Sequence, residues 1–191
     1  NVQDGDDNVA GAVQTAAIDS NALNIQIGNG NEAGNVQTAT LEADAATHQV
    51  GNGNNAANVQ TDSEGVSAAV AQFGSDNTAG NTQVGVSDAL AGIVQVGSGN
   101  MASNVQKFGS SQVAALTFQS GDDNNAANVQ GAEAVSTVLG LPVSSQNAPA
   151  SLSAAAIVQS GDDNTAMNVQ GGSVNVLDLG IISQVNAPAP A

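Results

Sequence analysis

The sequence contains no cysteine, tryptophan or tyrosine, and Lys107 is its only basic residue apart from one histidine. Without cysteine the chain forms no disulfide bond and has no thiolate chemistry. Its 191 residues include only three phenylalanines, although large apolar side chains supply most of the burial energy of a core, roughly 1.5–3 kcal/mol each. The chain is therefore either disordered or held together by something other than a conventional core.

Positive charge is nearly absent, and the net charge is -16. Nucleic acid is bound through cationic groups that displace counterions, so the composition excludes nucleic acid as a partner, and it equally excludes docking on anionic lipid. Apolar runs such as AAAIV at 154–158 are far shorter than the ~20 residues that span a bilayer, and we expect no membrane insertion. The first residue is Asn1, which leads us to expect a processed mature chain.

The sequence is dominated by an internal repeat. The residues QIGNGNEAGNVQ at 26–37 return as QVGNGNNAANVQ at 49–60. The shared pattern Gln-x-Gly-x-x-Asn-x-Ala-x-x-x-Gln occurs seven times, and its leading glutamine recurs after 23 residues four times, then after 24 and 40. A disordered tract holds no such period, so the repeat predicts a folded array. Its amide positions are Gln3, Asn8, Gln14, Gln26, Asn31, Gln37, Gln49, Asn54, Gln60, Gln72, Asn77, Gln83, Gln95, Asn100, Gln106, Gln119, Asn124, Gln130, Gln159, Asn164 and Gln170.

Each repeat predicts a strand, a turn and a second strand. Gly-x-x-Asn is typical of a turn, since glycine and asparagine adopt positive φ at low cost. After the turn, asparagine, alanine and glutamine recur at every second residue, as at Asn54, Ala56, Asn58 and Gln60, which is the period of a strand. A helix is excluded because glycine and asparagine would interrupt each of its turns. We therefore expect an all-β fold.

One strand-turn-strand unit is too short to bury a face, whereas copies stacked about 4.8 Å apart bury one together. The predicted fold is a β-solenoid of such β-arch repeats with two parallel sheets, able to continue as a cross-β polymer. Matching amides then bond along the stack; each bond contributes about 1 kcal/mol, while a buried orphan costs about 1–3 kcal/mol, so the ladders mainly penalise register slips. We assign six repeats to 1–130, an insertion to 131–152, a seventh repeat with a degenerate final rung to 153–184, and a Pro/Ala tail to 185–191.

Over 1–130 and 153–170 the chain resembles the curlin repeat of curli fibre subunits, Ser-x5-Gln-x-Gly-x2-Asn-x-Ala-x3-Gln. The resemblance implies a secreted, extracellular subunit that polymerises into an amyloid fibre for biofilm matrix and adhesion. It also implies a homopolymer, a nucleator subunit and an outer-membrane secretion channel as partners, and inward-facing Gln, Asn and Ala. The family serine is present only as Ser20 and Ser153 and is replaced elsewhere by Ala43, Val66, Ala89 and Val113.

Acidic turns lie at both ends of the array. If the seventh repeat of one copy met the first repeat of the next, their carboxylates would lie in adjacent rungs, where two exposed charges about 4.8 Å apart repel by nearly 1 kcal/mol. Two interpretations remain open: solvated turns that only aid solubility, or a control point sensitive to pH or divalent cations. The residues are Asp6, Asp7, Asp122, Asp123, Asp162 and Asp163. We expect no ordered metal site.

A column of valines occupies the opposite phase of the second strand. The alternation alone does not decide which phase is buried; the resemblance places the amides inside, and the valines, together with Phe73 and Phe118, outside. An exposed apolar column either marks a partner surface, against a second protofilament or the 131–152 insertion, or reflects the strand preference of valine. The column comprises Val13, Val36, Val59, Thr82, Val105, Val129 and Val169.

Enzymatic function is not supported by the residues. His48 is the only histidine and has no partner at a recurring offset. Adjacent carboxylates in turns do not form a cleft with separated acid and base roles, and no Lys or helix follows the glycines as in a phosphate loop. We therefore expect no catalysis and no cofactor. Two functions remain: a structural fibre subunit, and a monomeric β-solenoid binding module of adhesin or ice-binding type.

Overall fold

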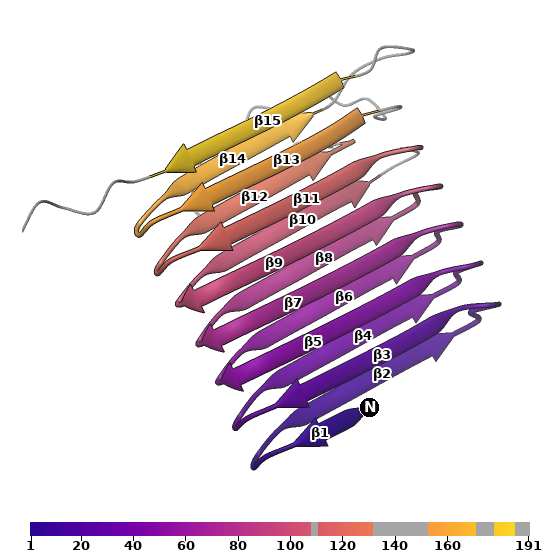
Figure 1. The fold of residues 1–191 in the computed structure, drawn as a ribbon. Helices are drawn as coiled ribbons and strands as arrows, with labels where there is room; N and C mark the ends of the chain where they lie inside the picture. The colour runs from indigo at the N-terminus through magenta and orange to yellow at the C-terminus, as the bar shows by residue number, and fades with distance from the viewer. Residues whose placement is uncertain (108–110, 132–152, 171–177, 186–191) are drawn as a thin grey trace, which may run out of the picture.

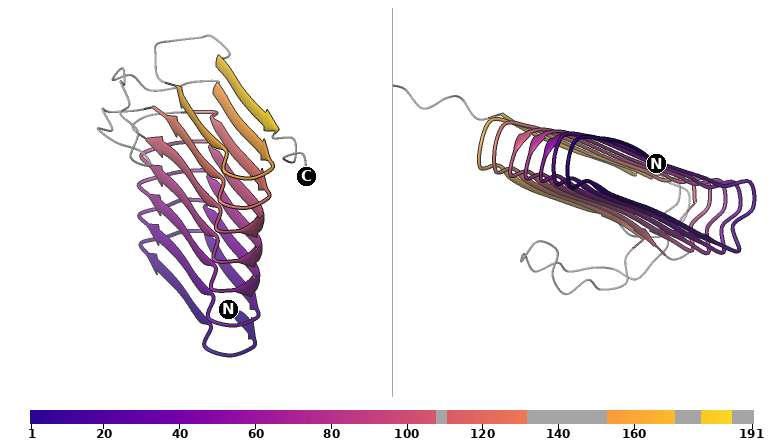
Figure 2. Two further views of the ribbon diagram at one scale, coloured as in Figure 1. Left: turned by 90° about the vertical axis from the view of Figure 1, so that its left-hand side faces the viewer. Right: turned by 90° about the horizontal axis from the view of Figure 1, so that it is seen from below.

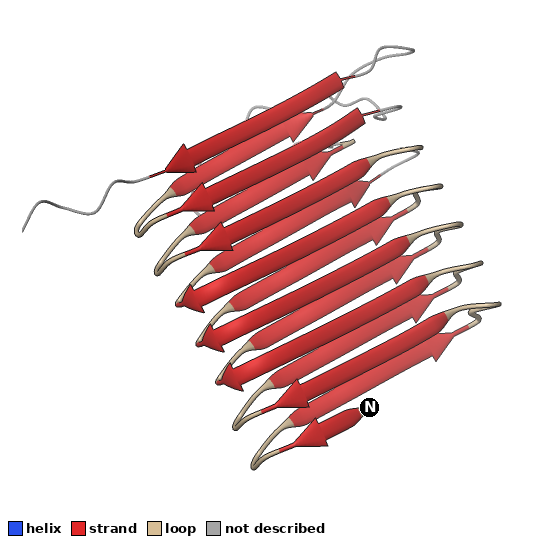
Figure 3. Ribbon diagram, viewed as in Figure 1, coloured by secondary structure: helices blue, strands red, loops and turns tan. Residues whose placement is uncertain are grey.

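The computed structural model describes residues 1–107, 111–131, 153–170 and 178–185, which form strands joined by tight turns (Figure 1). No helix is present among these residues (Figure 3), and accordingly none that could span a membrane is found in the described ranges. The strands wind into a flattened coil whose two long sides are parallel sheets facing each other (Figure 2). The predicted all-β solenoid with two parallel sheets is confirmed.

The two sheets alternate along the chain. The eight-stranded sheet has the order β1-β3-β5-β7-β9-β11-β13-β15, and the seven-stranded sheet runs from β2 through the even strands to β14. We call an odd strand and the even strand that follows it a rung. The odd strands are β1 Val2–Asp4, β3 Asn21–Ile27, β5 Asp44–Asn52, β7 Ser67–Ser75, β9 Leu90–Ser98, β11 Ala114–Ser120, β13 Ser153–Ser160 and β15 Asp178–Val185. The even strands are β2 Val9–Thr15, β4 Glu32–Thr38, β6 Asn55–Thr61, β8 Thr78–Val84, β10 Met101–Lys107, β12 Asn125–Gln130 and β14 Thr165–Gln170.

The register of the sheets follows the sequence repeat. Gln26 pairs with Gln49 and Gln49 with Gln72 in the eight-stranded sheet, and Gln37 pairs with Gln60 in the seven-stranded sheet. The longer steps do not shift this register, because β11 pairs with β13 and β12 with β14 by the same matching of equivalent residues. Within the described ranges, the degenerate final rung contributes β15 alone, which pairs with β13.

The interior consists of alternating amide and small apolar columns. Gln, Asn and Ala of the repeat point inward. The repeat glutamines from Gln26 to Gln130, in both sheets, are fully buried. Where the eight-stranded sheet replaces an inward polar residue by Val70 or Ile93, these side chains pack on Ala56, Ala79 and Ala102 of the opposite sheet. The alternative of a valine interior with exposed amides is thus excluded by the structure.

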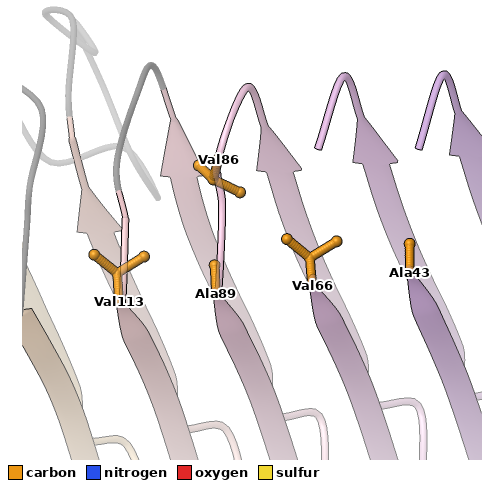
Figure 4. Close-up of a cluster of buried hydrophobic side chains, with 5 residues drawn as sticks. All are labelled: Ala43, Val66, Val86, Ala89 and Val113. Atoms are coloured by element: carbon orange, nitrogen blue, oxygen red, sulfur yellow. The ribbon is translucent and has the colours of Figure 1, made fainter. Parts of the chain in front are cut away.

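The positions that replace the family serine form an apolar corner. Ala43, Val66, Ala89 and Val113 occupy the same place in successive rungs, where the chain enters an odd strand, and Val86 joins them (Figure 4). All five are at most 3% exposed. In the preceding rung Ser20 instead places its hydroxyl 3.3 Å from that of Thr40. The corner is therefore closed by hydrogen bonds at one end of the solenoid and by apolar packing along the rest.

The outward columns agree with the sequence prediction except at one position. Val36, Val59 and Val105 are half-buried on the outer face, and Phe73 and Phe118 are 37% and 41% exposed. Val129 is the exception, since it lies on the outward phase of β12 and is only 1% exposed. The segment proposed to cover the valines, 131–152, lies almost wholly outside the described residues, as does the APAPA tail.

Candidate functional site: the amide ladders and the end rungs

The glutamines of both sheets form continuous hydrogen-bonded ladders. In the eight-stranded sheet Gln26 Nε2 donates to Gln49 Oε1, and Gln49 Nε2 to Gln72 Oε1, both at 2.9 Å. In the seven-stranded sheet Gln37 donates to Gln60 at 2.9 Å. Each buried amide nitrogen also reaches a main-chain carbonyl; for Gln49 these are Glu32 O at 2.9 Å and Asn54 O at 3.0 Å. The ladder therefore satisfies side chains that could not be buried singly.

We call the turn from an odd strand to the next even strand the first turn. Its asparagine makes three hydrogen bonds to neighbouring rungs. Asn54 Nδ2 donates to Asn31 Oδ1 at 3.0 Å and to Gly74 O at 2.9 Å, and the Asn54 N–H donates to Asn31 Oδ1 at 3.1 Å. The carbonyl of Gly74 is available because this glycine has φ 125°, a conformation open in practice only to glycine. This geometry explains the invariant Gly-x-x-Asn spacing: the glycine of one rung serves the asparagine of the rung before it.

The turn conformation differs from the sequence prediction at the asparagine. Positive φ occurs at the glycine and at the third turn residue, such as Gly30 with φ 63° or Asp76 with φ 56°, but not at the asparagine. The asparagine is retained for its buried amide, and the left-handed position is filled by Gly or Asp. Gly and Asp tolerate that conformation, Asp because its short side chain can bond locally.

The second residue of the first turn, directly after the glycine, has a role that the sequence analysis missed. Its side-chain oxygen accepts a main-chain N–H from the preceding rung: Asp6 N–H donates to Asn29 Oδ1 at 2.9 Å, and Ser98 N–H donates to Asp122 Oδ1 at 2.8 Å. Asp122 N–H donates in turn to Asp162 Oδ1 at 2.9 Å. The sequence signal for this role was the presence of Asn or Asp at this position in most repeats.

These contacts place the six acidic turn residues. Asp122 and Asp123 lie one rung from Asp162 and Asp163, and all four are exposed. Asp6 and Asp7 are also exposed and lie between β1 and β2, the strands at the opposite end of the solenoid (Figure 1). The carboxylates of Asp122 and Asp162 are hydrogen-bond acceptors, so their stacking has a favourable component beside charge repulsion. Among the described residues, no three His, Cys, Asp or Glu side chains are grouped as metal binding would require.

The ladders have a direction. Each repeat glutamine from Gln3 to Gln119 donates its Nε2 toward the rung of higher residue number, as in Gln3 to Gln26 at 2.8 Å and Gln95 to Gln119 at 2.9 Å. The turn asparagines donate the opposite way, as in Asn31 Nδ2 to Asn8 Oδ1 at 3.1 Å. The two ends of the solenoid therefore present different chemistry, and only stacking in one sense continues both ladders.

The β1–β2 end exposes a slice of the interior. Gln3 and Gln14, equivalent to the fully buried Gln26 and Gln37, are exposed, and so is Ala12. Gln14 Nε2 donates to Gln37 Oε1 at 2.6 Å and to Ser20 O at 2.8 Å. No described residue donates to Oε1 of Gln14. This acceptor and the free edge of β2 form the candidate assembly site.

The other end is stepped. In the seven-stranded sheet the last strand is β14, whereas the eight-stranded sheet continues to β15, in register with β13 from Asp178 to Val185. A copy stacked directly on the β13–β14 rung would need the place of β15. Direct stacking of Asp162 and Asp163 on Asp6 and Asp7 of another copy, as the sequence analysis assumed, is thus blocked in the eight-stranded sheet while β15 remains in place.

One ladder is interrupted beside the insertion. Asn104 Oδ1 accepts from Asn128 Nδ2 at 3.0 Å and from Thr117 Oγ1 at 2.9 Å. The oxygen of Asn128 itself, although buried, has no hydrogen-bond partner. The neighbouring ladders continue across the same step, since Gln119 donates to Gln159 at 2.8 Å and Asn164 to Asn124 at 2.9 Å. The step between β12 and β14 therefore lacks an asparagine bond that the steps from β4 to β12 have in this column.

Comparison with models of known protein families finds no match, and comparison with curated proteins finds no significant relative. The fold and the ladders define the class nevertheless: a repeat β-solenoid, compatible with a structural or adhesin-type module. The curlin resemblance rests on the repeat motif alone.

Proposed function

We propose that this chain is a structural subunit of an extracellular, curli-like amyloid fibre that assembles head to tail by β-strand addition. The observation that carries the proposal is the exposed β1–β2 rung. Its inward residues have no rung beyond them, whereas the equivalent residues of the inner rungs are buried. An added copy whose β15 has left its place on β13 would bury this slice with its β13–β14 rung and continue the amide ladders, gaining the same contacts that hold neighbouring rungs together.

The edge of β2 carries none of the features that usually block strand addition. Its sequence, VAGAVQT, contains no charge and no proline, whereas soluble proteins commonly protect an edge with Lys, Pro or a bulge. The ladder direction favours one polarity, because head-to-head contact would set the acceptor oxygens of Gln3 and Gln14 against each other. The fibre is therefore expected to be polar.

The biological setting is proposed on the motif. Curli-like repeats imply secretion through an outer-membrane channel, a nucleator subunit that starts the fibre, and a role in biofilm matrix and adhesion. The proposal includes no catalysis, no cofactor and no nucleic-acid partner.

A proline at Ala12 tests strand addition directly. Val9 N–H donates at 2.8 Å to the carbonyl of Asn31, the residue before β4. Successive N–H groups of a strand point to alternate neighbours, so the Ala12 N–H points to the free edge. Ala12→Pro therefore removes no hydrogen bond within one solenoid but removes one from the joint. We expect fibre elongation, followed by dye binding and negative-stain microscopy at micromolar protein, to slow at least tenfold.

Ala12→Gly is the matched control, because it changes the same side chain and keeps the N–H; it should elongate within about twofold of the unaltered chain. Urea denaturation of freshly purified monomer should give similar midpoints for both variants. Equal elongation by the proline and glycine variants contradicts addition at this edge. An unaltered chain that stays monomeric and folded would instead support the adhesin-type binding module.

A further inference from the structure

The outer face of the eight-stranded sheet, the front layer in Figure 1, carries most of the exposed large apolar side chains that lie on described strands. Side chains that are 37% to 46% exposed protrude from five of its strands; they include Leu23, Ile27, Phe73, Leu116, Phe118 and Val158. The seven-stranded sheet has a more polar outer face, where Glu32, Asn55 and Thr78 occupy one column. The valine column singled out from the sequence lies on that more polar face.

This apolar face is nearly free of charge although the chain has a net charge of -16. Strands β3, β7, β9, β11 and β13 contain no Asp or Glu, and β5 has only Asp44, at its first residue. The other acidic residues of the described rungs lie mainly in the turns at the two edges. Two equally charged copies can thus approach through this face without setting carboxylates against each other.

The face also has matching relief. A hollow of about 300 Å³ lies over the middle strands, lined by small residues including Ala46, Ala69 and Gly92 and bordered by Leu23 and Ile25. One border rises beyond Gly92, because Leu116 Cδ2 lies 2.9 Å from where a β-carbon of residue 92 would stand. The same face therefore carries both a hollow and protruding Leu and Phe side chains of a size to enter it.

We propose that the outer face of the eight-stranded sheet docks a second copy of this chain, face to face, with protruding side chains of one copy entering the hollow of the other. From β3 to β13 the face measures roughly 700 Å² per copy on standard strand dimensions. The faces of two copies together therefore reach the 1,200–2,000 Å² that a stable interface buries in total. This lateral contact is separate from axial strand addition and needs only the folded solenoid.

The β9–β10 rung offers a matched pair of substitutions. Val94 of β9 lines the apolar hollow, and Val105 of β10 lies on the opposite face; both are half-buried and point outward. Val94→Glu should reduce the fraction of paired filaments in cryo-electron micrographs at least tenfold, whereas Val105→Glu, with the same added charge, should leave it within twofold. Circular dichroism and urea midpoints of the monomers check that both fold.

Val94→Thr and Val105→Thr repeat the comparison without charge, and only the former should narrow the filaments. A loss of pairing from Val105 substitutions, equal losses from both, or no loss from either overturns the proposal. Axial assembly is read independently as filament length. If no filaments form at all, sedimentation velocity of the solenoid still decides, since face-to-face docking predicts a dimer that Val94→Glu dissociates and Val105→Glu does not.

Discussion

At the scale of single residues, the protein buries amides where most proteins bury hydrocarbon. A glutamine such as Gln60 is acceptable inside because Gln37 donates to its oxygen at 2.9 Å and its own nitrogen donates to Gln83 at 3.0 Å. Each bond contributes little on its own, yet removing one partner leaves a buried group unpaired. The stabilising unit is therefore the column of glutamines, not the individual side chain.

Replacing Gln60 by leucine tests this point. Gln60→Leu leaves Gln83 Oε1 buried without its donor, and we expect a loss of about 2–3 kcal/mol. Gln14→Leu is the matched control from the same column, because water reaches the exposed end rung and can replace the lost bond to Gln37; it should cost under about 1 kcal/mol. Urea denaturation of monomers measures both, and equal losses would contradict a ladder whose strength depends on burial.

Glycine at the first turn is a second requirement of single residues. A β-carbon on Gly51 would overlap the carbonyl oxygen of Gly74, and Gly51 also has φ 126°. Gly51→Ala should therefore destabilise the solenoid by more than about 3 kcal/mol.

Gly34 provides the control, since a β-carbon there meets nothing within 4 Å and its φ is not in the positive region. Gly34→Ala should be neutral or stabilising by up to about 1 kcal/mol. Thermal unfolding of both variants measures the contrast, and a mild effect at Gly51 would contradict the close stacking of the turns.

At the scale of elements, the two kinds of turn are built differently. The first turn begins with a glycine of positive φ in every described rung. The turns after β2, β4, β6 and β8 place Ala16, Ala39, Asp62 and Gly85 in the left-handed region. Main-chain bonds such as Ala39 N–H to Thr15 O at 2.8 Å hold this second turn. The second turn therefore places alanine in the left-handed region at Ala16 and Ala39, a strained choice that the first turn avoids by using only Gly or Asp there.

Ala39→Gly should relieve part of that strain. Alanine with φ 51° destabilises the fold by about 1–2 kcal/mol, which glycine would remove. Glycine also makes the unfolded chain more flexible, which destabilises the fold by about 0.4–1 kcal/mol. We expect a net gain of up to about 1 kcal/mol in urea denaturation. The same change at Ala57, on the outer face of β6 with ordinary strand φ, should instead destabilise; a loss at both positions would mean that the second turn is unstrained.

The strands and their pairing could be predicted from the sequence because equivalent residues of successive repeats pair with each other. The equal spacing of Gln26, Gln49 and Gln72 was enough to place one above another. The same alternation could not decide which face is buried, since a period of two is symmetric between faces, and the family resemblance was needed. The motif also does not distinguish Val129, the one buried member of the valine column among the described residues, because every valine of that column occupies the same position of the repeat.

The apolar face of the eight-stranded sheet was not predicted for a similar reason. Its columns are irregular, with Leu23, Ala46, Ala69, Gly92 and Leu116 at equivalent positions. A search for recurring residue types finds the uniform valine column and passes over a column whose members differ. Shape and charge become visible only when the rungs are stacked.

At the scale of the whole molecule, the solenoid separates two kinds of contact. Its ends carry directional amide ladders suited to axial growth, and one of its faces is apolar and almost uncharged, suited to side-by-side docking. Most carboxylates lie in the turns, away from both surfaces. The net charge of -16 can thus keep the chains dispersed while leaving both contacts available.

The bond from Gln119 to Gln159 spans 40 residues at 2.8 Å, as short as its counterparts that span 23. This glutamine ladder thus continues across the longer connection between β12 and β13. That connection is consequently a natural place to graft a foreign peptide: a sequence inserted there would be carried once per subunit, at regular intervals along any filament the protein builds.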